Sequence, residues 1–595
     1  MAADRKVIET DVLIVGSEGA GSRAAIEVAK VGLKVLIATK GVFTKCGATL
    51  TADMDIDLPS KDAKDWFGLD GDERDTVEAF AQDMFEEGKY MNNEEVVLAH
   101  CSNAAKYIKE LVDWGMNVGG LIHSPGHRYP RGILSTGRSM MEALKKGCRP
   151  HKIDFIEHVM ITDVLTKGGR AVGGAGINIR TGEFLVVKAK AVILATGGSM
   201  RLYPITTAPE ELTGDGFNMA FKAGAEMVDM EFPLFLPCCL YWPPGALGID
   251  FPYIFTSDVG GWWLNRFGVR FMEKWDPVRM EMGTTRDVGS IAMMMEILEG
   301  RGSPHGGIYA SCKHLPAELL DQSAHSDREF WRNFVYGQFD LVEFGLDPRK
   351  VAFEAGPASH YWNGGIKVNA KGATNVPGLY AAGEVQGGTM GSNRLSGNAV
   401  TECLVFGALS GIAAADYAKK AAPAEIDESQ VTKIYDRIQA PLNRKDGADV
   451  YEMRKKMQQV SYKCISPVRE ENGLNECIAE AEKMKKEALP NMVVKNKGKI
   501  YNREWVTALE NEALLLVMEV VSKASLMRPE SRGAMYRRDL TETDNKDWLK
   551  NIIVSNKDGK VSLEAKPVVT TSQITMPERT KVPYMVPTWK YEKKH

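Results

Sequence analysis

The first forty residues carry the pattern that most restricts the fold. An apolar strand, DVLIV from Asp11, leads into the glycine-rich turn GSEGAG at residues 16–21, a helix-like segment at 22–32, and a second apolar strand at 34–39. Strand, glycine turn, helix and strand form a βαβ unit of the kind that binds a dinucleotide, with the pyrophosphate at the helix N-terminus. The turn departs from that pattern at Glu18, where a glycine normally lets the backbone approach the pyrophosphate.

The glycines that remain support a working turn. Gly16 permits the tight turn and Gly21 permits close packing of the helix on the strand. A carboxylate that faced the phosphates would repel them, so we expect Glu18 to point outward as a solvated substitution. The alternative is that Glu18 hydrogen-bonds a ribose or contacts a partner.

Later segments favour a flavin over a nicotinamide cofactor. The apolar strand within 186–200 ends in Ala195-Thr196-Gly197, and the strand within 376–385 ends at Glu384, whose acid suits a ribose hydroxyl. A long apolar helix opens at Asn398, and its positive end suits the flavin edge that gathers negative charge on reduction. These segments predict an α/β fold with a two-part FAD-binding domain.

Composition excludes several functional classes. The net charge of -4 gives no sign of a nucleic-acid surface. The nine cysteines lack C-x-x-C spacing, which argues against an iron–sulfur cluster or any metal site in this chain and for reduced thiols in the cytoplasm. We find no leader before the first strand and expect no apolar run long enough to span a membrane.

Motifs in order along nearly the whole chain carry a family resemblance. They include GGWWLNRFGVRFMEKWDP, TTRDVGSIAMMMEILEGRG, ASHYWNGGI, GLYAAGEV, GSNRLSGNAV and RPESRGAMYRRDLTETDNKDWLKNIIV. The sequence resembles the flavoprotein subunit of the succinate dehydrogenase and fumarate reductase family. The resemblance implies a two-part FAD-binding Rossmann-like domain with an inserted α+β capping domain, then a helical domain and a C-terminal extension. These correspond to residues 1–232 with 353–412, 233–352, 413–527 and 528–595.

The resemblance also assigns roles to residues. Arg286 in TTRDV matches the arginine that passes a proton to the substrate, with Asp287 as the adjacent candidate for a supporting relay. His360 and Arg394 match residues that clamp a substrate carboxylate, a role that suits a bidentate guanidinium. The residues expected to bind FAD are Gly16, Gly19, Ala20, Gly21, Thr39, Lys40, Ala195, Thr196, Gly197, Asp215, Glu384, Arg394, Asn398, Ala399 and Val400.

Departures from the family pattern narrow the chemistry. Gly47 stands where the family has the histidine linked to the flavin, so we expect noncovalent FAD, with the neighbouring Cys46 as a packing residue. Leu236 replaces the histidine that holds the second carboxylate, and the shortened stretch FTSDVGGWW lacks the family's glutamate and arginine. We expect an apolar and aromatic lining there instead, formed by Leu236, Tyr241, Trp242, Trp262 and Trp263.

Three functions remain open at the level of sequence. The first is an FAD-dependent oxidoreductase acting on a C–C bond beside a single carboxylate, with a monocarboxylic unsaturated acid as substrate. The second is ordinary fumarate reductase or succinate dehydrogenase activity. The third is a flavin electron-transfer subunit with a degenerate pocket. The family implies an iron–sulfur partner subunit, in some members on a membrane anchor, and the tail at 580–595 is either a docking arm or a disordered end.

Overall fold

A parallel five-stranded sheet forms the centre of the FAD-binding part. The structure is a computed structural model that describes residues 5–324, 345–571 and 573–585. All neighbouring strands of this sheet pair in parallel. The strand order is β18 (Leu379–Ala381), β11 (Ala191–Leu194), β2 (Val12–Val15), β3 (Val35–Ala38) and β7 (Ile153–Ile156). This arrangement confirms the expected α/β fold.

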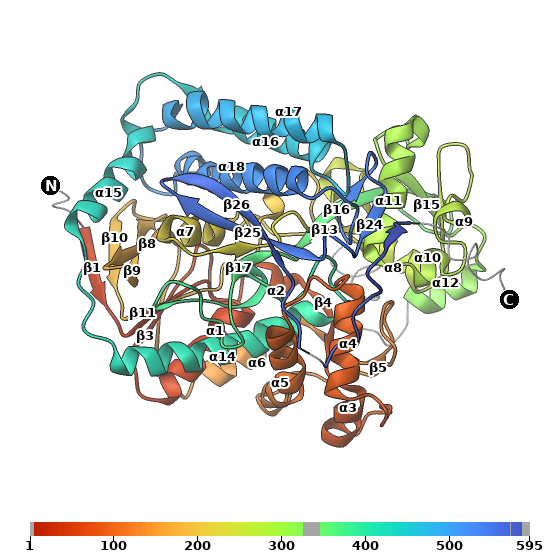
Figure 1. The fold of residues 1–595 in the computed structure, drawn as a ribbon, viewed down its shortest axis with the longest axis horizontal. Helices are drawn as coiled ribbons and strands as arrows, with labels where there is room; N and C mark the ends of the chain where they lie inside the picture. The colour runs from red at the N-terminus through yellow and green to blue at the C-terminus, as the bar shows by residue number, and fades with distance from the viewer. Residues whose placement is uncertain (1–4, 325–344, 572, 586–595) are drawn as a thin grey trace.

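Side chains alternate between the two faces of this sheet, as the period of a strand requires. Val12 and Ile14 pack with α1 (Gly19–Lys30) and α14 (Asn398–Lys420), which run along one face (Figure 1). Leu13 and Val15 pack on the other face with a second, four-stranded sheet. Its order is β1 (Arg5–Glu9), β10 (Phe184–Lys188), β9 (Arg170–Asn178) and β8 (Val159–Lys167).

Small residues let α1 and α14 approach closely. A Cβ atom at Gly407 would lie 2.6 Å from the carbonyl oxygen of Ala20, and one at Gly411 would lie 2.6 Å from that of Ala24. Within the described residues α14 alone is long and apolar enough to cross a bilayer, which was not expected from the sequence. However, 67% of its apolar window is buried inside the fold, as in the core helix of a globular protein.

Two elements cross between the expected domains: β16 (Phe353–Trp362) pairs within the sheet of the cap, and α14 runs past the expected boundary at residue 412. The sheet of the capping region has the order β13 (Pro233–Leu240), β16, β15 (Ile308–Ser311), β14 (Trp262–Leu264), so β16 continues the cap beyond residue 352. The helices of the cap are α8 (Phe251–Ser257), α9 (Met272–Trp275), α10 (Met280–Gly283), α11 (Arg286–Glu296) and α12 (Ala317–Ala324).

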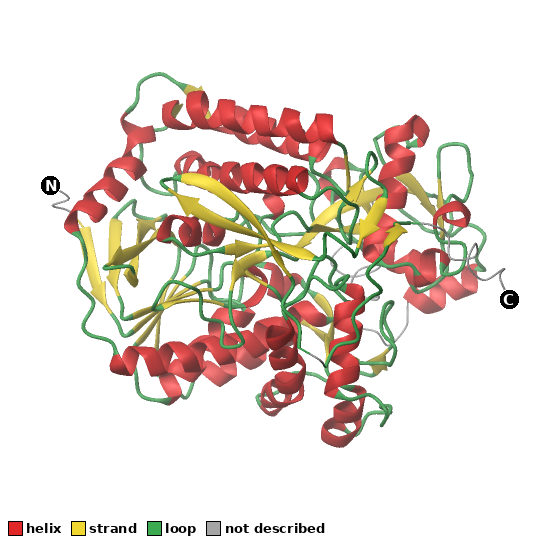
Figure 2. Cartoon of the chain, in the orientation of Figure 1, coloured by secondary structure: helices red, strands yellow, loops and turns green. Residues whose placement is uncertain are grey.

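The segments between β3 and β7 form a helical lobe around a small antiparallel sheet. The sheet has the order β4 (Asp53–Asp57), β6 (Gly132–Thr136), β5 (Leu121–Ile122). Figure 2 shows these helices below the central strands and the later helices above them. The lobe contains α2 (Ala48–Thr51), α3 (Ser60–Phe67), α4 (Val77–Glu87), α5 (Glu94–Asp113) and α6 (Gly137–Cys148).

The later helices lie along the opposite side of the molecule (Figure 1). They are α15 (Glu428–Asn443), α16 (Val450–Cys464), α17 (Glu471–Lys483) and α18 (Arg503–Met527). Of these helices α18 packs on α7 (Asp215–Ala223) of the FAD-binding part, and the others pack on α18, within one hydrophobic core.

The last segment of the chain returns to the FAD-binding part. Strands β25 (Lys550–Lys557) and β26 (Lys560–Pro567) form a hairpin, and β25 pairs with β12 (Met227–Val228). They complete a sheet that also contains β17 (Gly365–Lys367) and β19 (Gln386–Gly387). A short pair, β24 (Glu542–Asp544) with β27 (Lys581–Pro583), carries the chain to Met585. The predicted tail beyond 585 lies outside the described residues.

A buried ion-pair network fixes this last segment. Arg528 is fully buried, its Nε donates to Glu231 Oε1 at 2.8 Å, and its Nη1 donates to Glu530 Oε1 at 2.9 Å. Its Nη2 also donates to the Lys550 carbonyl at 2.8 Å. Because Glu231 precedes the cap and Lys550 opens β25, this guanidinium ties segments about three hundred residues apart in sequence.

Removal of this guanidinium should destabilise the fold strongly. Arg528→Met leaves Glu231 and Glu530 buried without one of their partners, a loss that costs about 3–5 kcal/mol. Arg5, whose pair with Glu428 is largely exposed, offers the matched control, because an exposed ion pair contributes about 0–1 kcal/mol. Thermal unfolding of Arg528→Met and Arg5→Met tests this. Equal decreases in unfolding temperature would contradict a larger stabilising role for Arg528.

Candidate active site

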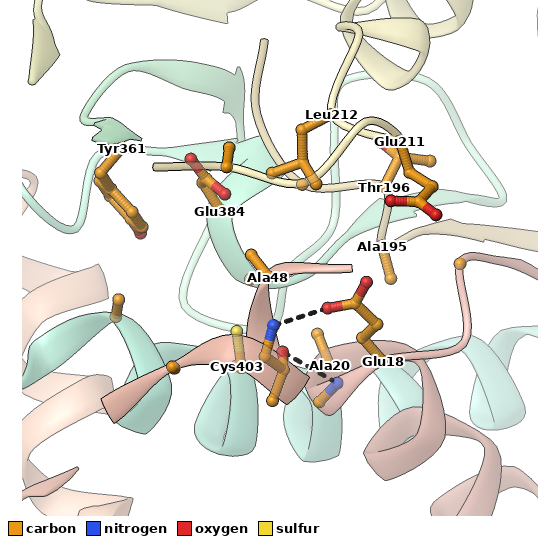
Figure 3. A pocket seen from close by; sticks show the side chains of 18 of the residues that line it. Glu18, Ala20, Ala48, Ala195, Thr196, Glu211, Leu212, Tyr361, Glu384 and Cys403 are labelled. Carbon is orange, nitrogen blue, oxygen red and sulfur yellow. Dashed lines mark hydrogen bonds between the residues drawn. The ribbon is translucent and has the colours of Figure 1, made fainter. Parts of the chain in front are cut away.

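One continuous cavity joins the glycine turn to the predicted catalytic residues. It has a volume of about 320 Å³ and is lined from Gly16 at one end to Arg286, His360 and Arg394 at the other. Its floor is formed by segments that follow the carboxyl ends of β2, β3, β11 and β18, where ligands bind in open α/β sheets. Figure 3 shows part of the lining, with Glu384 and Tyr361 on one wall and Glu18 on another.

Most of the predicted FAD-binding residues line this cavity. Gly21 and Asn398 do not appear in the lining. Gly21 serves packing, since a Cβ atom there would lie 2.0 Å from the Gly16 carbonyl oxygen. Asn398 holds the start of α14, because its Nδ2 donates to Asp57 at 2.8 Å and its Oδ1 lies 2.8 Å from His100 Nε2. The lining residues are Gly16, Gly19, Ala20, Thr39, Lys40, Ala195, Thr196, Gly197, Asp215, Glu384, Arg394, Ala399 and Val400.

The surroundings of the turn fit a dinucleotide. Gly16 has φ +109°, and a Cβ atom there would lie 2.1 Å from the Ala195 carbonyl oxygen, so only glycine is accommodated. The hydroxyl of Thr196 is buried without a hydrogen-bond partner in the described structure. Burial raises the pKa of Glu384 to about 8, and its carboxyl faces the cavity. Both groups would gain partners from the hydroxyl and phosphate oxygens of a bound dinucleotide.

Lys40 is already neutralised within the fold. Its Nζ lies 2.7 Å from Asp215 Oδ2 and 3.2 Å from Glu510 Oε1. Since Glu510 lies on α18, this ion-pair cluster ties the helical region to the wall of the cavity. Lys40 and Asp215 therefore line the cavity as an ion pair, so the lysine is not a free cation there.

Glu18 does not lie where it was expected from the sequence. Its carboxylate points inward and accepts a hydrogen bond from the Thr49 backbone N–H at 2.8 Å (Figure 3). It lines the cavity, and a Cβ atom at Gly47 would lie 0.8 Å from Glu18 Oε1. The expectation of an outward, solvated side chain was wrong, because the space above Gly47 accepts the carboxylate.

Arg286, His360 and Arg394 converge at the far end of the cavity. His360 lies on β16, Arg286 is the first residue of α11, and Arg394 precedes α14. The Arg394 Nη2 lies 3.5 Å from His360 Nε2, and the Arg286 Nη2 donates to Ser396 Oγ at 3.0 Å. The Nε atoms of both arginines are buried without a partner in the described structure. Such unpaired donors suit a bound anion.

The electrostatics of this cluster favour a carboxylate ligand. Burial lowers the pKa of Arg394 to about 10, and the nearby charge of Arg286 adds to the effect. Burial and the two arginines hold the pKa of His360 well below its usual range, so the imidazole is neutral. Its Nδ1 lies 2.8 Å from Thr207 Oγ1, which orients the ring. An incoming carboxylate would relieve the repulsion between the two guanidinium groups.

Carboxyl groups flank the rest of this end. Asp55 and Asp250 line the cavity together with Leu236 and Tyr253. The Asp55 Oδ2 accepts from Ser124 Oγ at 2.7 Å and from Ser396 Oγ at 3.2 Å. Burial raises the pKa of Asp250, and the charge of Arg286 opposes that rise. Sequence reasoning missed Asp55, Asp250 and Tyr253, because isolated residues of common types carry no motif.

Most of the aromatic residues expected in the lining lie elsewhere. Trp263 is fully buried in the core of the cap, and Trp262 stacks on His314 with ring centroids 3.8 Å apart. Tyr241 donates to the Pro357 carbonyl at 2.7 Å, and Trp242 stacks on His305. Of the expected set only Leu236 lines the cavity, so the prediction that Tyr241 and the three tryptophans form the lining was wrong.

Asp287 also has other partners. It accepts hydrogen bonds from Thr285 Oγ1 and Tyr584 OH, both at 2.5 Å, and lies 4.0 Å from Lys89 Nζ. It is absent from the cavity lining, whereas Asp250 lies there with Arg286. Asp287 thus links the C-terminal segment, through Tyr584, to the start of α11.

Comparisons with known proteins agree across the whole chain. Residues 11–400 match the family described as an FAD binding domain, and residues 454–582 match the fumarate reductase flavoprotein C-terminal family. The chain is 32% identical over 571 residues to one subunit of the fumarate reductase (CoM/CoB) of Methanothermobacter marburgensis, and the match covers 93% of this chain and 98% of the relative.

Two bacterial proteins of known structure share the fold. Mycobacterium smegmatis Sdh1 in complex with UQ1 is 30% identical, with a TM-score of 0.84 and 96% of each chain covered. A variant of E. coli quinol fumarate reductase is 25% identical, with a TM-score of 0.86, and the match covers 96% of this chain and 99% of that one.

The cluster should bind simple carboxylates even without turnover. Arg394→Ala removes one guanidinium from a desolvated pair, and the loss of such a partner costs about 2–5 kcal/mol in binding. We expect crotonate to raise the thermal unfolding temperature of the flavin-loaded protein, and Arg394→Ala to abolish the rise. Crotonamide serves as the uncharged control. An equal rise with crotonate in the variant would show that the carboxylate binds elsewhere.

Proposed function

We propose that this chain, which belongs to the family of fumarate reductase and succinate dehydrogenase flavoprotein subunits, acts on an unsaturated acid with a single carboxylate. The chain is an FAD-dependent oxidoreductase that acts on CH–CH groups, as its family match and relatives show. The resemblance drawn from its motifs is thereby confirmed. The proposal concerns the substrate, the roles of individual residues and the form of the flavin.

The observation that carries the proposal is the asymmetry of the cavity. Arg286, His360 and Arg394 gather at one place and provide donors for one carboxylate. The neighbouring lining contains Leu236, Asp55 and Asp250 and adds no further arginine, lysine or histidine from the described residues. A second carboxylate there would be desolvated beside two acids, which costs several kcal/mol. A neutral or hydroxyl-bearing substituent avoids that cost.

The residues have distinct roles in this proposal. Arg394 and His360 hold the carboxylate, and Thr207 keeps the His360 ring oriented through Nδ1. Arg286 holds a proton on its guanidinium next to the substrate carbon. FAD, when bound, supplies the hydride acceptor or donor. Asp250, which also lines the cavity and is close enough for the charge of Arg286 to act on its carboxyl, exchanges that proton with the arginine in this proposal.

The flavin is proposed to be noncovalent. Gly47 stands at the position of the family's linked histidine, and the space that a side chain there would fill is taken by Glu18. Cys46 is close by, but burial raises the pKa of its thiol to about 11, so it remains a weak nucleophile near neutral pH.

Electron transfer requires a partner. The relatives include subunits of succinate dehydrogenases and fumarate reductases, and we propose that an iron–sulfur subunit exchanges electrons with the flavin here too. We further propose that the chain works in the cytoplasm, either free or peripheral to a membrane through that partner.

Denaturation should release the flavin. Acid precipitation of the purified protein is expected to leave the yellow cofactor in the supernatant, because no side chain at position 47 can form the bond. Mass spectrometry of the precipitated chain provides the check. A mass increase equal to that of FAD would mean that another residue carries the link.

The substrate proposal is tested by comparing acids with one and two carboxylates. With a reduced viologen dye as electron donor, kcat/KM for crotonate or cinnamate should exceed that for fumarate by about tenfold or more. Leu236→His should lower the ratio of the monocarboxylate kcat/KM to the fumarate kcat/KM, because it replaces an apolar group of the lining with a partner for a second carboxylate. Asp250→Asn should lower the same ratio, because it removes a charge that repels a second carboxylate.

The relatives' names favour fumarate as the second candidate. A kcat/KM for fumarate of about 10⁴ M⁻¹s⁻¹ or above, with the monocarboxylic acids slower, would establish that activity instead. Asp258→Asn is the control for Asp250→Asn, because Asp258 lies in the same region of the cap but outside the cavity lining. It should leave the ratio of the monocarboxylate kcat/KM to the fumarate kcat/KM unchanged.

A further inference from the structure

Glu18 occupies the most sensitive position of the dinucleotide turn. In the pattern that begins at Gly16, the third residue is where the chain passes closest to the pyrophosphate. Glu18 is the residue that precedes α1, yet its side chain makes no capping hydrogen bond to that helix. Instead it lines the cavity and bonds the Thr49 N–H at the start of α2. The carboxyl group therefore lies on the wall that a bound pyrophosphate approaches.

The side chain of Glu18 fills the space that a side chain at position 47 would need. Gly47 has φ +77° and precedes α2, and a Cβ atom on it would lie 0.8 Å from Glu18 Oε1 and 1.8 Å from Glu18 Cδ. Any side chain at position 47 would thus displace the carboxyl group. The turn thus has an acid where glycine is usual, and the facing segment has a glycine whose missing side chain leaves room for that acid.

Within the described residues no cation neutralises this carboxyl. They give Glu18 no ion pair, and the titratable groups among them that face it are Cys46 from the segment after β3, Cys403 from α14 and Glu211 from the opposite wall. Each of these is neutral as a thiol or negative as a carboxylate. A buried carboxyl in such surroundings favours its neutral form.

We propose that Glu18 makes FAD binding depend on protonation: the neutral carboxyl group admits the cofactor's pyrophosphate, and the ionised carboxylate repels it. A neutral carboxyl can donate a hydrogen bond to a phosphate oxygen, whereas a carboxylate beside the dianion adds only repulsion. FAD binding is therefore coupled to uptake of a proton by Glu18. The proposal rests on FAD as the cofactor and is independent of the substrate.

The direction of the pH dependence follows from the burial of Glu18. Desolvation is the main cause that raises its pKa to about 7, and the charge of Glu211 adds to it, while the bonds from Thr49 act in the opposite direction. FAD affinity is thus full below that pH and falls as the pH rises through it. The histidines nearest the cavity keep lowered pKa values and do not titrate in this range.

The test is FAD titration of the full-length apoprotein, followed by flavin fluorescence at constant ionic strength. Between about pH 6 and pH 8 the dissociation constant should rise about tenfold, because only the fraction with neutral Glu18 binds. Glu18→Gln, which keeps the acceptor for Thr49, should bind FAD equally at both pH values. A flat wild-type profile, or an unchanged rise in Glu18→Gln, would overturn the proposal.

Glu384→Gln is the matched control. Glu384 also lines the cavity, and burial raises its pKa to about 8, so it titrates in the same range. Its variant should bind FAD more weakly overall yet keep the loss of affinity on going from about pH 6 to pH 8. If Glu384→Gln flattens the profile and Glu18→Gln does not, the proton belongs to Glu384 and the proposal fails.

A double-mutant cycle tests the reciprocal packing without reference to pH. Gly47→Ala should lower the thermal unfolding temperature more in the wild-type protein than in the Glu18→Gly background, where the space is free. The strain of alanine at positive φ is present in both backgrounds and cancels in the cycle. Equal shifts would show that Glu18 does not occupy the space above Gly47.

Discussion

The packing of α1 against α14 determines how the two ends of the cavity are related. The first helix begins at the glycine turn, and the second begins at Asn398, four residues after Arg394. Ala20, Ala24, Gly407 and Gly411 bring the two backbones together, which leaves little freedom for sliding or rotation. This packing sets where Arg394 lies relative to the dinucleotide turn, although nearly four hundred residues separate them in sequence.

Repulsion between two arginines is present in the cavity, and a bound anion would reduce it. Arg286 and Arg394 repel each other, and each has an Nε without a partner in the described structure. Asp55 and Asp250 partly balance these charges in the free protein. A bound carboxylate offers the arginines better geometry than the aspartates do, because two oxygens can meet a planar guanidinium. In the proposed complex, the same two aspartates would repel a second anion.

Local motifs predicted what short stretches of chain determine. The βαβ unit and the convergence of Arg286, His360 and Arg394 follow from patterns a few residues long. The direction of Glu18 could not be predicted in this way, since it depends on the absence of a side chain at Gly47, twenty-nine positions away. Likewise, β13 has an irregular register between Leu236 and Cys239, so strict alternation does not reveal which residue faces the cavity. Trp263 was misplaced because it fills the core of the cap, whereas Trp242 and Trp262 are exposed and stack on histidines.

The return of the chain in β25 and β26 affects the order in which the protein can be made. The central sheet lacks β18 until about residue 381 is synthesised, and the sheet begun by β12 waits for β25 at Lys550–Lys557. Domains usually fold as they leave the ribosome. Here the FAD-binding part lacks one of its sheet neighbours until translation is nearly finished. The edge of β12 that faces β25 thus stays unpaired in the nascent chain until residues 550–557 have been made. The sheet that joins β12, β17 and β19 to the end of the chain therefore closes only after the last strands have been made.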